Sequence, residues 1–356
     1  MAHRKRASSI RSPGRSVGSA KQKTKQESRK LTRSLLHLPS RIHEYITSFP
    51  SSVRYVAAVL GSLVLSAAMY SGTSSITVGD LATVCRDSQN GWEAGALIAW
   101  RAVLLGISWV LGFDGQDIAE FALLTHFPIY SLLATFYQIR PTTVLLALSI
   151  DIAALTLPFV LLRGLNSVHT LRSPRSKTVS NRMILKDPLI AIYTSAAATA
   201  LYSVALYLSY ATWLPVHLVT YFDEIPDISA VHTGPAALPG LFLKFIFNGY
   251  AIYDLLFVSS IGYAEDEKET VDPVHGEYLI TSLYKRTWGR LSRKWKILII
   301  RTIALALTTL LNTVIQLTSS IRGVSVEGSA GWGALWAVTA CLIGVLFAWI
   351  EAAPKA

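Results

Sequence analysis

Apolar runs about twenty residues long recur along most of this chain, and short polar gaps separate them. A helix of this length and composition crosses the hydrocarbon core of a bilayer, so the pattern predicts an all-α, polytopic transmembrane bundle over residues 53–350. Eight spans are predicted, at residues 53–70, 94–113, 118–139, 142–162, 188–213, 238–263, 297–318 and 331–350. Tyr55 and Tyr70 sit near the two ends of the first span, where interface aromatics are expected.

Lys and Arg fall into alternate gaps between these runs, which tests the count of spans. Of the 33 basic residues, 13 precede residue 55, six lie in 163–186, seven lie in 268–296, and one is Lys355. Eight crossings place these 27 on the side of the N-terminus, as the positive-inside rule expects for a cytoplasmic side. Three others face the opposite side: Arg86, Arg140 and Arg322.

The third run is the weakest span, because it carries Glu120, His126 and Pro128. If it did not cross, the basic 163–186 and 268–296 loops would lie opposite the basic N-terminus. The charge pattern therefore supports this span. An arrangement of spans two and three as a re-entrant pair keeps the same parity and leaves six crossings.

Composition agrees with a membrane protein, since 51% of the residues are hydrophobic, 15% are charged, and the mean hydropathy is +0.41. A net charge of +11 would suggest nucleic acid binding in a soluble protein. Here the excess lies in the tail and in membrane-flanking loops, so it predicts contact with anionic lipids of the inner leaflet, and nucleic acid is not an expected partner.

The N-terminal region divides into two predicted segments. Residues 1–30 are basic and poor in apolar residues, so we expect a disordered cytoplasmic arm, in which Ser8 and Ser12 are candidate phosphorylation sites. Residues 31–52 show apolar positions at helical spacing and predict an amphipathic juxtamembrane segment. Residues 351–356 form a short cytoplasmic tail.

A second amphipathic helix is predicted at about 277–296, in the last large inner loop. Ile280, Tyr284, Trp288, Leu291 and Trp295 fall at steps of three or four, as on one face of a helix. The other positions are basic, which favours docking on the inner leaflet or specific binding of anionic lipid head groups. The candidate head-group ligands are Lys285, Arg286, Arg290, Arg293, Lys294 and Lys296.

Ionisable residues inside the spans are the strongest candidates for a functional site, because a charge in hydrocarbon costs roughly 2.5–3.5 kcal/mol unless it faces protein or water. Arg101 and Asp151 both approach the mid-plane and are predicted to pair, either as a polar binding or proton-relay site or as a structural ion pair. Asp254 lies deep in the sixth span, near Asn248 and Tyr253, and His126 lies at intermediate depth.

Three further charges, Glu120, Lys244 and Arg301, lie near enough to span ends to reach the interface by snorkelling.

Small residues recur four apart on the fifth and eighth spans, a spacing that lets helices approach closely. These stripes are Ser195, Thr199 and Ser203, and Gly333, Ala337 and Cys341. They predict contacts with membrane-protein partners. Cys85 lies in a polar loop away from Cys341, so neither a disulfide nor a zinc site is expected.

No compact catalytic motif, metal site or cofactor site is expected, and no catalytic residue is assigned. The sequence therefore favours a non-catalytic assembly factor, tether or lipid- or partner-binding subunit. The alternatives are a secondary transporter or channel that uses Arg101, Asp151 and Asp254, and an intramembrane lipid-modifying enzyme such as a cyclase. The expected membrane is the endoplasmic reticulum or nuclear envelope, with both termini cytoplasmic; the alternatives are mitochondrial and plasma membranes.

Overall fold

The computed structural model describes residues 49–86, 91–166, 168–169, 181–262, 288–289 and 291–352. The chain divides into two compact units, Met1–Pro50 and Ser51–Ala356, and the helices below belong to the second. The predicted basic arm with Ser8 and Ser12, most of the juxtamembrane segment and the tail beyond residue 352 lie outside the described residues.

Within the described ranges, eight helical segments are long and apolar enough to cross a membrane, which confirms the predicted all-α bundle. Six are the single helices α2 (Ser51–Gly72), α4 (Gly91–Val110), α5 (Gly115–Thr135), α6 (Pro141–Leu162), α8 (Pro188–Ala211) and α14 (Val326–Ala352). The seventh, α13 (Arg293–Ser320), is 28 residues long. The eighth is composite: α10 (Leu238–Ile252) continues through a π-helical turn, Tyr253–Val258, into α11 (Ser259–Gly262).

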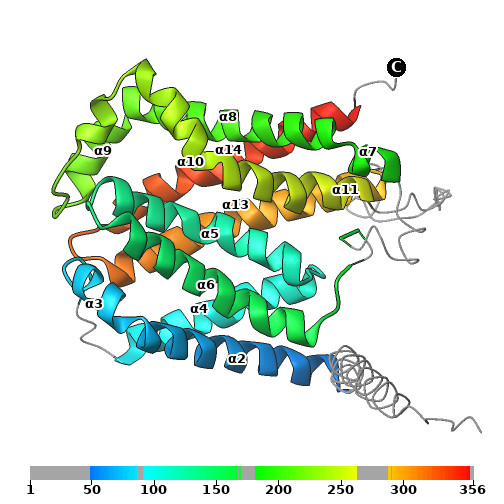
Figure 1. Cartoon of the computed structure of the whole chain (residues 1–356), viewed down its shortest axis with the longest axis horizontal. Helices are drawn as coiled ribbons and strands as arrows, with labels where there is room; N and C mark the ends of the chain where they lie inside the picture. Colours follow the sequence, from blue (N-terminus) through cyan, green and yellow to red (C-terminus); the bar gives the residue numbers. More distant parts are fainter. Residues whose placement is uncertain are drawn as a thin grey trace, which may run out of the picture. The chain divides into compact units, whose positions relative to one another are not determined.

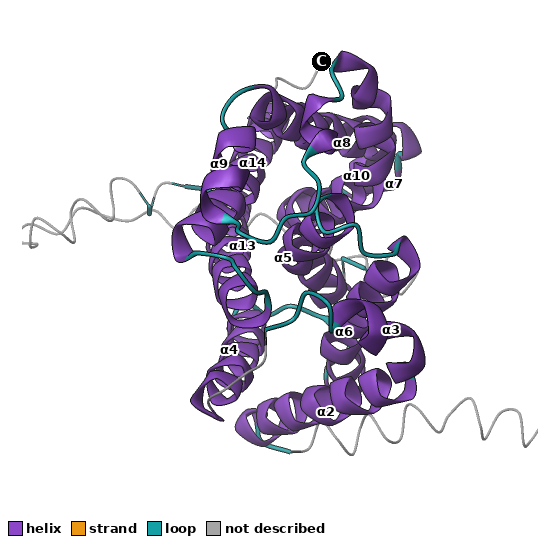
Figure 2. Ribbon diagram, turned by 90° about the vertical axis from the view of Figure 1, so that its left-hand side faces the viewer, coloured by secondary structure: helices purple, strands orange, loops and turns teal. Residues whose placement is uncertain are grey.

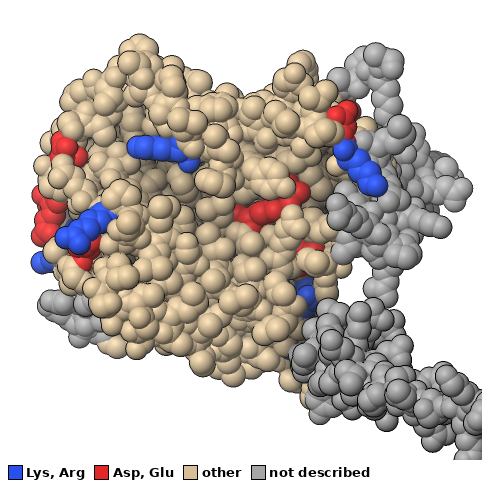
Figure 3. Space-filling view, in the orientation of Figure 1, with Lys and Arg blue, Asp and Glu red and all other residues tan. Residues whose placement is uncertain are grey.

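Shorter helices cap the bundle: α3 (Ser74–Leu81), α7 (Arg182–Lys186) and α9 (Leu214–Tyr221). Figure 1 shows α2 starting and α14 finishing at the same end, as an even number of crossings requires. We call this the inner end, because the positive-inside pattern predicts that it faces the cytoplasm. In Figure 3 most visible charged side chains gather at the two ends, and the band between them is uncharged apart from a basic patch and an acidic patch.

At the outer end, two backbone bridges join connecting segments that are far apart in sequence. Cys85 pairs with Ile321, and Phe222 pairs with Val324. The segment between α13 and α14 is therefore held on one side to the loop after α3 and on the other side to the end of α9. Cys85 and Cys341 are both free thiols.

The helices differ widely in how much of their surface the bundle covers. In α5 and in the composite Pro235–Gly262 segment 67% of the apolar window is buried, against 17% in α2 and 22% in α4. Figure 2 shows α5 and α13 in the middle of the molecule, with α2 and α4 at one edge. The weakest predicted span is thus one of the two most buried.

Hydrogen bonds at the start of α5 and from neighbouring helices explain why this helix, which carries several polar residues, lies at the centre of the bundle. Asp114 accepts from the backbone N–H groups of Gln116 and Asp117, and the Asp117 side chain accepts in return from the Asp114 N–H, so a reciprocal capping box begins the helix. Further along, the carbonyl of Pro128 accepts a 2.8 Å hydrogen bond from the indole of Trp332 on α14. Neighbouring helices therefore satisfy polar groups that lipid could not.

Most of both small-residue stripes lies at contacts within the chain, although Cys341 is exposed. A Cβ at Gly249 of α10 would lie 2.7 Å from the Ser195 carbonyl and 2.9 Å from the Thr199 nitrogen of α8, so these two backbones touch. Gly333 of α14 lies close to α13 as well, although less tightly, since a Cβ there would be 3.2 Å from the Leu310 carbonyl. The predicted close approach of helices is real, but much of the surface offered to partners is already occupied by the chain itself.

The described part of the predicted 277–296 helix differs from the prediction. Trp288 and Gly289 form a turn, and a new helix, α13, begins only at Arg293. Residues 277–287 and Arg290 lie outside the described residues. The basic residues 293, 294 and 296 belong to the first turn of a membrane-spanning helix, and Lys294 is buried there with 8% of its surface exposed.

Candidate functional site

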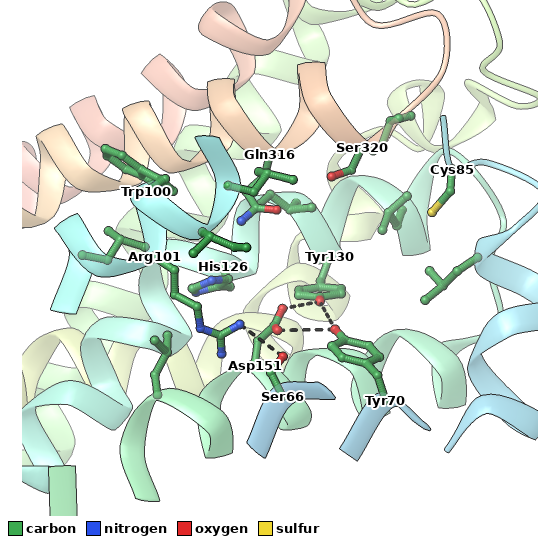
Figure 4. Close-up of a pocket in the computed structure, with 18 of the residues that line it drawn as sticks. Ser66, Tyr70, Cys85, Trp100, Arg101, His126, Tyr130, Asp151, Gln316 and Ser320 are labelled. Atoms are coloured by element: carbon green, nitrogen blue, oxygen red, sulfur yellow. Dashed lines mark hydrogen bonds between the residues drawn. The ribbon is translucent and has the colours of Figure 1, made fainter. Parts of the chain in front are cut away.

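A cavity of about 400 Å³ lies between α2, α4, α5, α6 and α13, and it brings together three of the four predicted intramembrane site residues. Arg101, His126 and Asp151 all line it, whereas Asp254 does not. The cavity extends from this polar cluster to the outer end of the bundle, where Cys85 and Ser320 line it (Figure 4). Most of the remaining lining is aliphatic, such as Leu97 of α4 and Ile129 of α5.

Arg101 is held by neutral groups of α2 and makes no direct ion pair. Its Nε donates to the Ser62 hydroxyl at 2.8 Å, and its Nη1 donates to the Ser66 hydroxyl at 3.1 Å. Among the described residues no carboxylate lies within the 4.0 Å that defines a salt bridge to Arg101, so the predicted contact with Asp151 is absent. The Arg101 Nη2 is buried and has no hydrogen-bond partner in the described part of the chain.

Two tyrosines bind the Asp151 carboxylate instead. The Tyr130 hydroxyl donates to Oδ2 at 2.5 Å, and the Tyr70 hydroxyl donates to Oδ1 at 3.3 Å. The two hydroxyls also lie 3.3 Å apart, which closes a triangle of polar groups (Figure 4). Sequence reasoning placed Tyr70 at the interface and did not single out Tyr130, because the pairing depends on how α2, α5 and α6 pack.

His126 presents one ring nitrogen to its own helix and the other to the cavity. Its Nδ1 lies 2.9 Å from the Ala122 carbonyl, so Nδ1 carries the proton and donates it. Its Nε2 is then an acceptor, and no described residue bonds to it; the ring lines the cavity beside Arg101 and Asp151 (Figure 4). The Nδ1 side of the ring therefore bonds within α5, while the ring also lines the cavity.

Asp254, the fourth predicted residue, belongs to a separate network near the inner end. It lies in the π-helical turn, and its Oδ2 accepts from the side-chain amide of Gln116. The Gln116 amide also donates to the Oε1 of Glu120 at 3.4 Å, and the Nε2 of His169 lies 3.9 Å from the Oδ2 of Asp254. The predicted neighbours Asn248 and Tyr253 do not hold it; residues of α5 and of the loop after α6 do.

A buried ion pair anchors the same network. The Arg301 guanidinium contacts both carboxylate oxygens of Asp117, at 2.6 and 3.2 Å, and also donates to the Leu255 carbonyl and the Ser259 hydroxyl. Arg301 is 4% exposed and Glu120 8%, so the snorkelling prediction was wrong for both. Lys244, by contrast, lies exposed on α10.

The inner end of this network is a charged pair in the connecting loops. The Nδ1 of His169 lies 2.7 Å from the Oδ2 of Asp114, and both side chains are buried. Burial alone would raise the pKa of Asp114, but the hydrogen bond and charge of His169, with two backbone N–H groups, hold it below 3.8. Burial would lower the pKa of His169, but the charges of Asp114, Asp117 and Asp254 raise it above 6.5.

Asp114, Asp117 and His169 also place one ligand atom each within 4.8 Å of one another, a spacing that a metal ion requires. The carboxylates are already engaged, since Arg301 binds both oxygens of Asp117 and the Nδ1 of His169 binds Asp114; only the Nε2 of His169 has no hydrogen-bond partner among the described residues. A guanidinium in contact with the cluster also disfavours a second cation there. The arrangement fits a structural hydrogen-bond network better than a metal site.

One comparison with known proteins bears on this region. Residues 187–315 match the family model described as the Bouquet formation protein 3 C-terminal domain. The match runs from the start of α8 into α13, and so it contains Asp254 and Arg301 but not Arg101, His126 or Asp151. Neither a curated protein nor a solved structure matches the chain.

Proposed function

We propose that this protein is a non-catalytic, multi-pass component of the nuclear envelope that serves as a membrane tether in telomere bouquet formation. The observation that carries the proposal is the match of residues 187–315 to the bouquet formation family. The positive-inside pattern supports this role, because it predicts that both termini face the cytoplasm or nucleoplasm, where chromosome ends are reached.

The contacts of the matched segment support a scaffold more than a reaction centre. Two of its buried ionisable residues, Asp254 and Arg301, are engaged by Gln116 and by the Asp117 carboxylate of α5. A bidentate pair of this kind specifies how two helices pack, and its charges are no longer free to act on a substrate. The segment is thereby locked onto the helices that precede it.

The exposed ends of the bundle are the surfaces through which a tether would recruit partners. The small-residue stripes of α8 and α14 contribute mainly to the internal contacts described above, so any partner that they bind must share them with α10 and α13. The basic residues predicted to bind lipid head groups, among them Lys285 and Arg286, would add attraction to the anionic inner leaflet.

The test is to replace the chromosomal copy with a fluorescently tagged chain and to image it with telomeres during meiotic prophase. We expect a rim at the nuclear envelope, and dispersed telomeres when the gene is deleted. Asp151→Asn and Asp254→Asn separate scaffold from chemistry, because both keep the shape of the side chain and remove its charge. If a tether acts without chemistry, both variants restore clustering when their abundance is normal.

Two results would contradict the proposal. One is residence of the tagged chain in another membrane, or normal telomere clustering after deletion. The other is a normally abundant Asp151→Asn or Asp254→Asn protein at the envelope that fails to restore clustering, which would indicate that a carboxylate takes part in a reaction or in transport.

A further inference from the structure

The cavity between α2, α4, α5, α6 and α13 has features of a ligand site rather than of a packing defect. Its volume of about 400 Å³ lies within the range of small-molecule pockets. Its walls are mostly aliphatic, and its polar groups converge at one place, around Arg101, His126 and Asp151 (Figure 4). Ile98 of α4 lines the cavity and is also 50% exposed on the surface that faces away from the bundle, so the cavity opens toward the lipid.

Two polar atoms at this place lack a partner among the described residues. The first is the Nη2 of Arg101, a buried donor; the other donors of this guanidinium, Nε and Nη1, bond to Ser62 and Ser66. The Nε2 of His126 is an acceptor, because Nδ1 donates to the Ala122 carbonyl. The buried Arg101 Nη2 costs free energy while it has no partner, and the His126 ring lines the cavity with no described residue bonded to its Nε2, so a group that accepts from the first and donates to the second would be stabilised here.

The net charge of the cluster selects the class of ligand. Arg101 and Asp151 contribute opposite charges to one cavity, so an anionic or cationic head group would leave one charge in excess near the middle of a span. A neutral hydroxyl avoids this cost, and it is the smallest group that accepts one hydrogen bond and donates another. The aliphatic walls suit the apolar body attached to such a hydroxyl.

We propose that this cavity binds a neutral membrane lipid whose head group is a single hydroxyl, such as a sterol or a diacylglycerol, with the hydroxyl between Arg101 and His126. The hydroxyl accepts from the Arg101 guanidinium and donates to the His126 imidazole, while Tyr70 and Tyr130 keep Asp151 occupied. The site is independent of the proposed tethering role, and no residue of the bouquet-family match, 187–315, is among the residues that line it.

The experiment uses the purified full-length chain in detergent and three photoreactive lipid probes: a sterol, a diacylglycerol and a phosphatidylserine. We expect the alcohol probes to label peptides of α2 and α4, and an excess of the matching unlabelled lipid to abolish the label. Arg101→Met and His126→Phe each remove one hydrogen bond and should lower probe affinity about tenfold. Stronger labelling by the sterol probe would indicate that the site prefers a rigid lipid, and stronger labelling by the diacylglycerol probe would indicate a flexible one.

Two matched pairs of variants separate binding from folding. Leu97→Trp and Leu63→Trp place a large ring in the cavity from α4 and from α2. Val103→Trp and Val64→Trp put the same ring on exposed positions of the same helices, 48% and 70% exposed respectively. We expect labelling to fall in the first two and to persist in the second two, with unfolding temperature measured for all four.

Labelling that maps outside α2 and α4, or that survives in folded Leu97→Trp and Leu63→Trp proteins, would overturn the site. Preferential labelling by phosphatidylserine would overturn the neutral-hydroxyl assignment.

Discussion

Arg301 and Arg101 both lie within membrane-spanning helices, but they differ in how many hydrogen-bond partners surround them. Arg301 lies between α13, α5 and the π-helical turn, where it is 4% exposed and meets a carboxylate, a backbone carbonyl and a hydroxyl. Arg101 lies on α4, whose apolar window is only 22% buried, and meets two serine hydroxyls beside a cavity. A full set of partners indicates a structural charge, whereas the unfilled set beside a cavity is the observation on which the proposed lipid site rests.

The same substitution at the two arginines tests this contrast most directly. Arg301→Met leaves Asp117 as a buried charge without its partner, a loss that typically costs about 3–5 kcal/mol. We expect the unfolding temperature in detergent to fall on the order of 10 °C. Lys244→Met, on the exposed face of α10, is the control and should change little.

A double variant sharpens that prediction. Replacing both partners, with Asp117→Leu and Arg301→Met together, removes the unpaired charge and should recover part of the lost stability. An Arg301→Met protein as stable as the unmodified chain would show that the pair does not hold α13 to α5.

Helix contact in the well-packed region gives the second prediction. Gly249→Ala would place a methyl group 2.7 Å from the Ser195 carbonyl, which forces α8 and α10 apart and should cost about 1–3 kcal/mol. Gly240→Ala, on the same helix, meets nothing within 4 Å and serves as the control. Equal unfolding temperatures for the two variants would mean that this close contact is not specific.

Arg101→Met should have a smaller effect, about 1 kcal/mol or less, because it removes two hydrogen bonds to neutral serines and leaves no carboxylate unpaired in contact. The unfolding temperature of this variant is compared with that of Arg301→Met under the same conditions. A loss as large as that of Arg301→Met would remove the distinction between the two sites.

The smallest expected effect is the pH dependence contributed by His169 and Asp114. Because the pKa of His169 is raised above 6.5, its stabilisation is complete below pH 6.5 and is lost as pH rises through the higher folded value. Because the pKa of Asp114 is lowered below 3.8, its stabilisation is present above pH 3.8 and is lost only under more acidic conditions. The pair therefore stabilises the fold best between these limits.

Unfolding temperatures measured across this range and up to pH 9 check the prediction. His169→Gln should flatten the decline on the alkaline side, whereas His232→Gln, in an exposed outer loop, should leave it unchanged. An identical alkaline decline in the His169→Gln protein would show that another group is responsible.

Sequence reasoning located the candidate residues but not their partners. It identified Arg101, Asp151 and His126 as deep polar groups, and the structure places all three at one cavity. It paired Arg101 with Asp151, whereas serines hold the one and tyrosines hold the other. Hydroxyl groups are too common in membrane helices for their roles to be read from spacing, since a partner on another helix depends on rotation and depth.

The sequence by itself determined the eight spans and their predicted orientation, because twenty apolar residues and the side on which Lys and Arg accumulate follow directly from the bilayer as solvent. Tertiary structure alone decided which spans lie inside. α5 has the lowest hydropathy of the eight, 1.3, and yet shares the greatest burial, because Asp117, Glu120 and His126 find partners in protein rather than in lipid. Hydropathy measures how well a helix suits contact with lipid, and a helix that is surrounded by other helices has little such contact.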